Sequence, residues 1–387
     1  MDVFVHVPKS SGSTVRSILS RQYGVEHIVY YEANSPYVDK TATPNTEIMY
    51  RDVNLITGHE PFGVHETLRL PCNYFTILRD PIRRALSDYY YAYSYERHRF
   101  RNEILSGSLT AERFLTEPMF GNLGTQIALL SGSSRSLNEL TAAIENVDHC
   151  FAAVGVAERF DESILYFAKT LGWRPPIYIN RNVSKLPDSI REARQQTEQE
   201  IILRHENLFR NEYRLYSHVI GQLDSRIQAQ GSAFSKALDA FCEIQGDIAK
   251  LAQSEVYELY ELHNTDALPE FAARYIDSQP YRVVDDYLRD SPLVSGEFHN
   301  YDGHVERKDG NRIAGWAIDL CSHQPIEVAI FKGREEVART MADRPRDDVL
   351  ANGYQRAEVG FLLTLDYEME NPADYQVCFG STKLQLR

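Results

Sequence analysis

The sequence predicts an α/β protein with a parallel β-sheet, followed by a helical connector and a small all-β sandwich. In residues 1–221, short apolar strands alternate with helical patterns and Gly/Pro turns, which is typical of a parallel sheet covered by helices. Residues 222–295 have a helical, acidic pattern without strand alternation. In residues 296–387 apolar side chains recur at every second position, as in half-buried strands. We therefore expect three regions, with boundaries near residues 221 and 295.

The first strand is expected at VFVHV, residues 3–7, and it leads through a loop of small residues into a helix. Val15, Ile18 and Leu19 follow the loop at helical spacing. Such a loop presents main-chain N–H groups and the positive end of a helix dipole, which together bind anions. The loop lacks the GxxxxGK[ST] order of a Walker A motif, and a plain serine-rich turn is the alternative interpretation. The candidate anion-binding residues are Lys9, Ser10, Ser11, Gly12, Ser13 and Thr14.

A second strand is expected at NYFTIL, residues 73–78, and a second helix begins just after it. Asp80 can cap this helix and Pro81 suits its first position. The helix has a stripe of apolar and aromatic residues at Ile82, Ala85, Leu86, Tyr89, Tyr90 and Tyr93. Arg79 follows the strand directly, and Arg83 and Ser87 lie one turn apart on the helix, so all three suit a terminal phosphate. An ion pair between Arg79 and Asp80 is the alternative.

The last region reads as a sandwich of roughly 90 residues, a typical size for one such module. Val328 and Ile330 precede the turn KGREE, and two further alternating segments follow. Their apolar positions are Phe361, Leu363 and Leu365, and then Val377 and Phe379.

Composition excludes several classes of protein. The chain has 387 residues, of which 43% are hydrophobic and 25% charged, as in ordinary globular proteins. Its 41 Lys and Arg against 55 Asp and Glu give a net charge of −14, so we expect no nucleic-acid partner. The five cysteines are scattered without metal-ligand spacing, and no apolar run reaches the ~18 residues of a membrane helix. We expect a reduced, cytoplasmic protein without a signal peptide, membrane segment or structural metal, and the sequence favours no particular oligomeric state.

With its two strand-to-helix anion motifs in order, the chain resembles the sulfotransferase superfamily, in particular the carbohydrate sulfotransferases. The loop that holds the 5′-phosphosulfate in that family is similar to HVPKSSGST at residues 6–14, and the 3′-phosphate motif is similar to LRDPIRRALSDYYY at 78–91. The resemblance covers most of residues 1–220 and departs at Ser10 and Ser11, where relatives commonly carry Thr-Gly. It implies a P-loop-like α/β fold.

The resemblance also implies the reaction. The donor would be 3′-phosphoadenosine 5′-phosphosulfate, the product adenosine 3′,5′-bisphosphate, and no metal is expected. Lys9 would stabilise charge on the leaving phosphate, and Arg79 and Ser87 would hold the 3′-phosphate. His59 in TGHEPFG is the expected general base, with Glu60 beside it as base or orienting partner and His65 as the rival. Arg181 and Asn182 resemble a later donor-contacting loop.

The acceptor is expected to be a hydroxyl group, most naturally of a glycan. The C-terminal segments IAGWAID, ADRPRDDV and VGFLLTL resemble a β-sandwich appended to bacterial glycosyltransferases and related glycan-modifying enzymes. The run of tyrosines from Tyr89 to Tyr95 can offer ring faces to a sugar, although core packing explains the ones on the apolar stripe. The basic residues Arg97, His98, Arg99 and Arg101 can attract an acidic acceptor, or they form a solvated helix end.

Two other functions stay open on the sequence. A nucleotide-dependent kinase would also use two phosphate sites, but the Walker A order and the carboxylates that bind Mg²⁺ are missing. A noncatalytic glycan-binding protein on the same fold is the second, and the presence of Lys9, His59, Arg79 and Ser87 argues against it.

Overall fold

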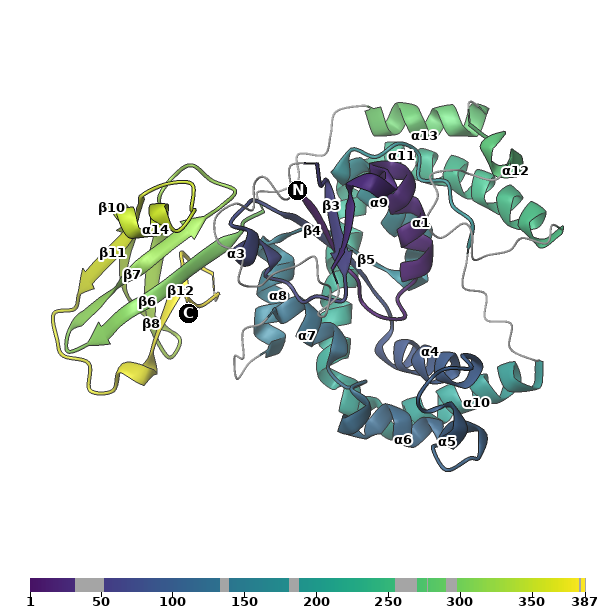
Figure 1. Ribbon diagram of the computed structural model, residues 1–387, viewed down its shortest axis with the longest axis horizontal. Coiled ribbons are helices and arrows are strands. Elements are labelled where there is room, and N and C mark those ends of the chain that lie inside the picture. Colours follow the sequence, from purple (N-terminus) through teal and green to yellow (C-terminus); the bar gives the residue numbers. More distant parts are fainter. Residues whose placement is uncertain are drawn as a thin grey trace.

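The computed structural model of the chain describes residues 1–31, 52–132, 139–180, 188–254, 270–276, 278–289, 298–382 and 384–386. Its centre is a five-stranded parallel sheet with the strand order β2-β3-β1-β4-β5 (Figure 1). The strands are β1 (Asp2–Val5), β2 (Ile28–Tyr31), β3 (Leu55–Gly58), β4 (Asn73–Leu78) and β5 (Phe151–Val156). The α/β class with a parallel sheet is therefore confirmed, and the strand expected at residues 73–78 is confirmed to the residue.

Helices cover both faces of the sheet. Figure 1 shows α1 and α9 on one side and α3, α7 and α8 on the other. These helices are α1 (Gly12–Tyr23), α3 (Val64–Leu68), α7 (Thr125–Ser131), α8 (Glu139–His149) and α9 (Phe160–Leu171). The predicted apolar stripe of α1 is buried, because Val15, Ile18 and Leu19 are each at most 1% exposed. Strands buried on both faces are the reason that the sequence of β4 reads as a continuous apolar run.

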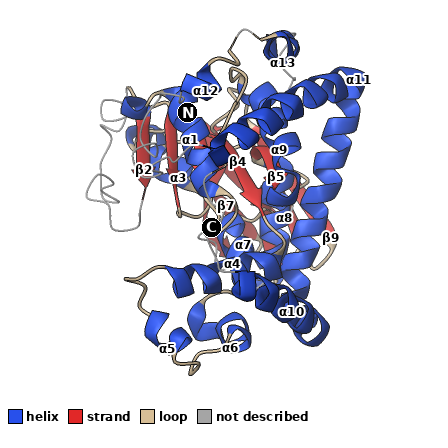
Figure 2. Cartoon of the chain, turned by 90° about the vertical axis from the view of Figure 1, so that its right-hand side faces the viewer, coloured by secondary structure: helices blue, strands red, loops and turns tan. Residues whose placement is uncertain are grey.

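A second group of helices lies beyond the carboxyl ends of the strands and has its own apolar cluster (Figure 2). Its members are α4 (Pro81–Ser94), α5 (Arg101–Leu105), α6 (Ala111–Thr116) and α10 (Asp188–His205). The predicted cap of α4 is confirmed, since the Asp80 carboxylate accepts the main-chain N–H of Arg83 at 2.9 Å and Pro81 occupies the first turn. Ile82, Ala85 and Leu86 are buried as the stripe predicts.

The segment after α10 is helical, as expected, but its helices are part of the main fold. The helix α11 (Arg210–Ser254) runs through the boundary expected at residue 221 and has one non-helical residue, Gly231. Its side chains, such as Leu215, Leu223 and Phe241, belong to the same apolar core as the sheet. The helix α13 (Gln279–Arg289) packs along α11, and α12 (Glu270–Ala273) lies near both.

The last region is a separate antiparallel all-β module, as the period of two predicts. One sheet has the order β10-β11-β7-β6 and the other β12-β8-β9, and apolar residues of both form one core. The elements are β6 (Tyr301–Asp309), β7 (Arg312–Asp319), β8 (Ile326–Lys332), β9 (Glu335–Ala342), β10 (Arg344–Pro345), α14 (Asp347–Ala351), β11 (Glu358–Thr364) and β12 (Tyr375–Phe379).

The module is bonded to the α/β region at the amino ends of β4 and β5. The main-chain N–H of Cys72, just before β4, donates to the side-chain carbonyl of Asn300 at 2.5 Å. The main-chain N–H of His299 donates to the carbonyl of His149, just before β5, at 2.7 Å. The all-β module therefore lies at the end of the sheet where the strands begin, and the carboxyl ends of the strands lie at the other end (Figure 1).

Three further properties bear on the sequence predictions. None of the helices in the described ranges combines the length and the apolar character needed to cross a membrane. The same ranges contain no group of three or more His, Cys, Asp and Glu side chains placed to hold a metal ion. The five cysteines are all free thiols.

Candidate functional site

The candidate site lies where the direction of chain progression in the sheet reverses. The strand β1 is at the middle of the order, with β3 on one side and β4 on the other, so the loops after β1 and β4 run in opposite directions. In open α/β sheets this crevice at the carboxyl ends of the strands is the usual place for a ligand. Both anion motifs of the sequence follow these two strands.

The loop between β1 and α1 has an unusual backbone. Lys9 has a φ of 66° and Ser11 a φ of 63°, both in the left-handed region that side chains other than glycine rarely adopt. The left-handed Ser11 precedes the helical Gly12, and such an alternation turns main-chain N–H groups toward one concave side that attracts anions. No side chain caps α1 at Ser11, while the main-chain N–H groups of Thr14 and Val15 donate to the Ser11 carbonyl at 3.0 and 3.1 Å.

Ser10 gives a second indication of a ligand at this loop. Its side chain is 1% exposed, and its hydroxyl has no hydrogen-bond partner in the part of the chain that the structure describes. A buried polar group without a partner costs about 1–3 kcal/mol and is rare in native proteins. A ligand oxygen in the concave side of the loop is one way to satisfy this hydroxyl.

The structure shows why position 12 requires a glycine, which the sequence did not show. A Cβ atom at this position would lie 1.7 Å from Nε2 of His6. The imidazole of His6 therefore occupies the space beside Gly12, so a side chain at this position is excluded. Burial lowers the pKa of His6 to about 3, with the charges of His59, Arg16 and Lys9 acting in the same direction, so His6 stays neutral.

His59 follows β3 and stacks on His6. The two ring centroids are 4.4 Å apart at an interplanar angle of 29°. Nδ1 of His59 lies 2.8 Å from the main-chain oxygen of His6, so Nδ1 carries a proton and donates it to this carbonyl. In the neutral ring this bond leaves Nε2 as the nitrogen that can accept a proton, and the side chain is exposed. The neighbouring Glu60 is half-buried.

Arg79 joins the two motifs. Its guanidinium donates to the main-chain oxygen of Lys9 at 2.9 Å, across the β1–β4 pair. The expected alternative was an ion pair with Asp80. Among the described residues the ion pair of Arg79 is with Glu158, at 4.0 Å, while Asp80 caps α4. Burial lowers the pKa of Arg79, and Glu158 acts in the opposite direction.

Lys9 is a half-buried cation at the centre of the site. Its Nζ lies 3.9 Å from the centroid of the Tyr91 ring. Burial lowers the pKa of Lys9 to about 8; the carboxylate of Asp88 raises it, while the positive charges of Arg79 and Arg194 lower it further. The positive charges of Lys9, Arg79 and Arg194, from two loops and from α10, therefore repel one another. A bound polyanion would reduce this repulsion.

Two residues of the site were missed in the sequence. Arg194 lies in an ordinary polar stretch of α10, where no local pattern marks it. Gln126 of α7 is 1% exposed, and its amide bonds both main-chain groups of Arg79: Arg79 N–H donates to Oε1 at 3.0 Å and Nε2 donates to the Arg79 carbonyl at 2.9 Å. The buried carboxylate of Glu212 in turn accepts the main-chain N–H of Gln126 at 2.9 Å.

The remaining predicted residues divide into three groups. Ser11, Ser13 and Thr14 are in the first loop and the first turn of α1, and Ser87 is half-buried on α4, one turn before Tyr91. His65, the rival base, is fully buried, with Nδ1 2.7 Å from the hydroxyl of Tyr74 and Nε2 3.2 Å from the carbonyl of Tyr301. Arg181 and Asn182 lie outside the described residues.

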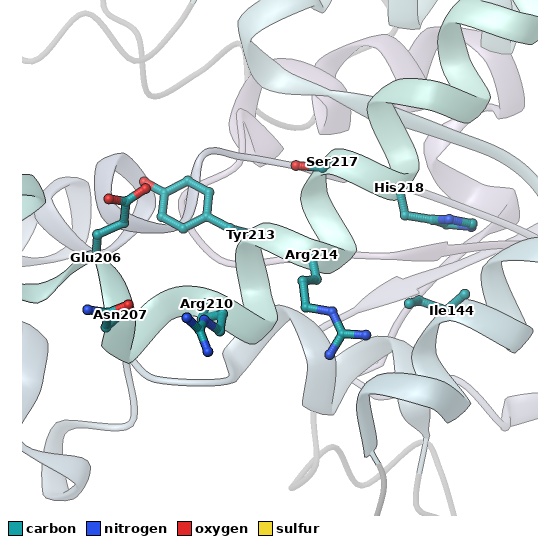
Figure 3. A pocket seen from close by; sticks show the side chains of 8 residues that line it. All are labelled: Ile144, Glu206, Asn207, Arg210, Tyr213, Arg214, Ser217 and His218. Atoms are coloured by element: carbon teal, nitrogen blue, oxygen red, sulfur yellow. The ribbon is translucent and has the colours of Figure 1, made fainter.

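An open hollow of about 680 Å³ lies elsewhere, between α8, α11 and the short helix η4 (Glu206–Phe209) (Figure 3). It contains neither of the two motifs. Its histidine, His218, is bonded to Asp148 at 2.6 Å, and Tyr213 at its wall donates to the carboxylate of Asp80. Its lining residues are Ile144, Glu206, Asn207, Arg210, Tyr213, Arg214, Ser217 and His218. The chemistry of the strand-end loops, and not this hollow, identifies the candidate site.

Comparison with known proteins adds no family to this description. No protein-family model matches the chain, and no curated protein matches it. The candidate site is therefore described by its own geometry.

Proposed function

We propose that the chain is a sulfotransferase that moves the sulfuryl group of 3′-phosphoadenosine 5′-phosphosulfate to a hydroxyl of a carbohydrate acceptor. The observation that carries the proposal is the contact between the two motifs, in which the Arg79 guanidinium donates to the Lys9 carbonyl at 2.9 Å. Two basic loops that meet at the carboxyl ends of β1 and β4 suit a nucleotide with anionic groups at both ends.

The side chains present fit such a donor. Lys9, the Ser10 hydroxyl and the N–H groups at Ser11 and Gly12 would hold its phosphosulfate end. Arg79, Arg194 and Ser87 would hold the 3′-phosphate, for which planar guanidinium groups are the preferred partners. The donor supplies a sulfuryl group whose bond to the phosphate oxygen breaks as a bond to the acceptor oxygen forms.

His59 would remove the proton of the acceptor hydroxyl. Its Nδ1–H donates to the His6 carbonyl, which fixes the ring and leaves Nε2 to take the proton. The stacked, neutral His6 adds no competing positive charge beneath the ring. Lys9 would stabilise the negative charge that develops on the leaving phosphate.

Binding of the product nucleotide is the direct test. Adenosine 3′,5′-bisphosphate at 100 times its dissociation constant should stabilise the fold by about 2.7 kcal/mol, visible as a higher melting temperature. Adenosine 5′-monophosphate, which lacks the 3′-phosphate, is the control ligand and should give a smaller shift. Transfer of ³⁵S from labelled donor to an acceptor supports the proposal. Transfer of ³²P from ATP would indicate a kinase, and binding without transfer a noncatalytic protein.

Donor binding should weaken at alkaline pH because Lys9 loses its proton. The lowered pKa of Lys9, about 8, means that the free protein carries the charge below pH 8 and loses it above. The phosphates of the nucleotide are already fully ionised there, because their second pKa is about 6. We expect the Kd of adenosine 3′,5′-bisphosphate, measured calorimetrically, to rise about fivefold from pH 8 to pH 9, because the charged fraction of Lys9 falls from about one half to about one tenth. A Lys9→Gln variant should show weaker binding at pH 7 and no such rise; an equal rise in that variant would contradict the assignment.

Gln126 should act as a positioning residue for Arg79. A Gln126→Leu variant removes both hydrogen bonds to the Arg79 main chain, so we expect a loss of stability of about 1–3 kcal/mol and a higher KM for the donor. The matched control is Asn146→Leu, which removes a buried amide bond to the Leu130 carbonyl away from the site. The control should lose stability without a change in donor KM. The same KM in both variants would show that Gln126 is only structural.

A further inference from the structure

A row of four aromatic rings leads from the core of the sheet to the candidate base. Phe4 of β1 and Phe75 of β4 are partners across the sheet, both side chains are at most 1% exposed, and their ring centroids are 5.1 Å apart. His6 lies two residues after Phe4, as side chains on one face of an extended chain do, and the two rings are stacked at 5.7 Å. His59 stacks on His6 in turn, at 4.4 Å.

The main chain of His6 holds the base in a second way. Its N–H donates to the Gly58 carbonyl at 2.8 Å, and its carbonyl accepts Nδ1–H of His59, also at 2.8 Å. A single hydrogen bond to one ring nitrogen lets an imidazole tilt about that bond, whereas a ring stacked against it restricts its plane. The bond and the stack together therefore favour one orientation of the His59 ring.

The edge of the His6 ring lies against the anion loop. The three atoms nearest to an added Cβ at Gly12 all belong to this ring, and Nε2 is the nearest, at 1.7 Å. The positive charge of Lys9 in the same loop also acts on His6. His6 therefore contacts the loop proposed to hold the donor and also the proposed base.

The His6 ring is suited to positioning a neighbour and not to taking up a proton itself. Burial lowers its pKa to about 3, and the charge of His59 acts in the same direction, so the ring stays neutral near pH 7. In the part of the chain that the structure describes, its ring nitrogens have no hydrogen-bond partner, whereas both ring nitrogens of the buried His65 lie beside oxygen atoms. Packing therefore holds the His6 ring, and its flat shape is what its neighbours contact.

We propose that His6 is a positioning residue for His59: its ring, between Gly12 and the His59 imidazole, holds that imidazole in the plane in which Nδ1–H donates to the His6 carbonyl. The proposal rests on the proposed function, in which His59 takes the acceptor proton, and it adds a residue that touches neither reactant. A stacked aromatic pair favours one arrangement by a factor of about two to ten, and a displacement of about 1 Å in a catalytic group can cost about 10²-fold in rate.

The test compares His6→Ala, which removes the ring, with His6→Phe, which keeps a flat ring. The tautomer of His59 is read in the full chain from its imidazole ¹⁵N NMR shifts, at a pH where the ring is neutral, and its signals are assigned by their loss in His59→Ala. An imidazole free in water prefers the Nε2–H form. We therefore expect the Nδ1–H form in the wild type and in His6→Phe, and a mixture in His6→Ala.

The same variants separate positioning from binding in the ³⁵S transfer assay. At saturating donor, kcat should fall about tenfold in His6→Ala and stay within about twofold of the wild type in His6→Phe. Melting temperatures measured for both variants show that the assays use folded protein.

Gly12 tests the link between the ring and the anion loop. It lies in α1 without a positive φ, so its backbone accepts alanine, and the His6 ring is what excludes the added Cβ. Gly12→Ala should therefore lower kcat and mix the His59 tautomers, but it should change little further in a His6→Ala protein. The matched control is Gly221→Ala in α11, where an added Cβ meets no atom within 4 Å, and it should change neither readout.

Four results would overturn the proposal. They are an unchanged His59 tautomer in His6→Ala, an unchanged kcat in that variant, a loss in His6→Phe equal to that in His6→Ala, and equal losses from Gly12→Ala with and without the His6 ring. The failure of the proposed function looks different. If the wild type transfers no ³⁵S, the donor assignment is wrong, while the tautomer series, which needs no turnover, still decides whether His6 holds His59.

Discussion

A Lys9→Ala variant should lose about 10³-fold in kcat for sulfuryl transfer. Lys9 is half-buried, and Arg79 binds its main-chain oxygen, so its ammonium is held at the junction of the two anion loops. A unit charge pair at 4 Å contributes about 4 kcal/mol at an effective dielectric of 20, and each ~1.4 kcal/mol corresponds to a factor of ten in rate. The measurement is single-turnover ³⁵S transfer at saturating donor, which separates the chemical step from binding.

The control for Lys9 is Lys332, which also lies over a tyrosine ring, at 5.5 Å from Tyr375 in the all-β module. Lys332→Ala removes a comparable contact in the all-β module, away from both anion loops, and should leave kcat unchanged. Lysine and alanine are equally strained in the left-handed backbone conformation of residue 9, so Lys9→Ala and the wild type have the same strain in the loop. A Lys9→Ala protein that folds, binds the nucleotide and keeps full kcat would contradict the role in catalysis.

Local sequence signals were sufficient for much of the fold. The strand at residues 73–78 and the Asp80–Pro81 start of α4 depend on neighbours in the chain, and both are confirmed. The period of two predicts the antiparallel module for the same reason. The boundary near residue 221 depends on how a helix packs, because α11 continues through it to cover the sheet. No local pattern carries that information.

The sequence predicted the two anion loops of the site but not the residues that other elements contribute to it. A loop after each of two strands implies that Lys9 and Arg79 share one edge of the sheet, and the 2.9 Å contact agrees. Gln126 and Arg194 come from helices whose positions depend on tertiary packing, so their sequences give no signal. The reason for Gly12 was also non-local, since it is the ring of His6 that excludes a side chain there.

The role of His59 can be separated from that of the other histidines. His65 is fully buried between Tyr74 and the all-β module, so His65→Ala should lower stability by about 1–3 kcal/mol without a specific effect on the chemical step. His218 is half-buried on α11 and bonded to Asp148, away from both loops, so His218→Ala should keep full turnover. These two variants are the structural and the surface control for His59.

A His59→Ala variant should keep the fold and donor binding and lose about 10²- to 10⁴-fold in rate. The side chain is exposed and bonds one main-chain oxygen, that of His6, so its removal leaves a gap open to solvent rather than a buried cavity. A small base can enter such a gap, and added imidazole should restore part of the activity in proportion to its concentration. Full turnover in His59→Ala, or a rate that imidazole does not raise, would show that the proton is taken by another group, with Glu60 the next residue to replace.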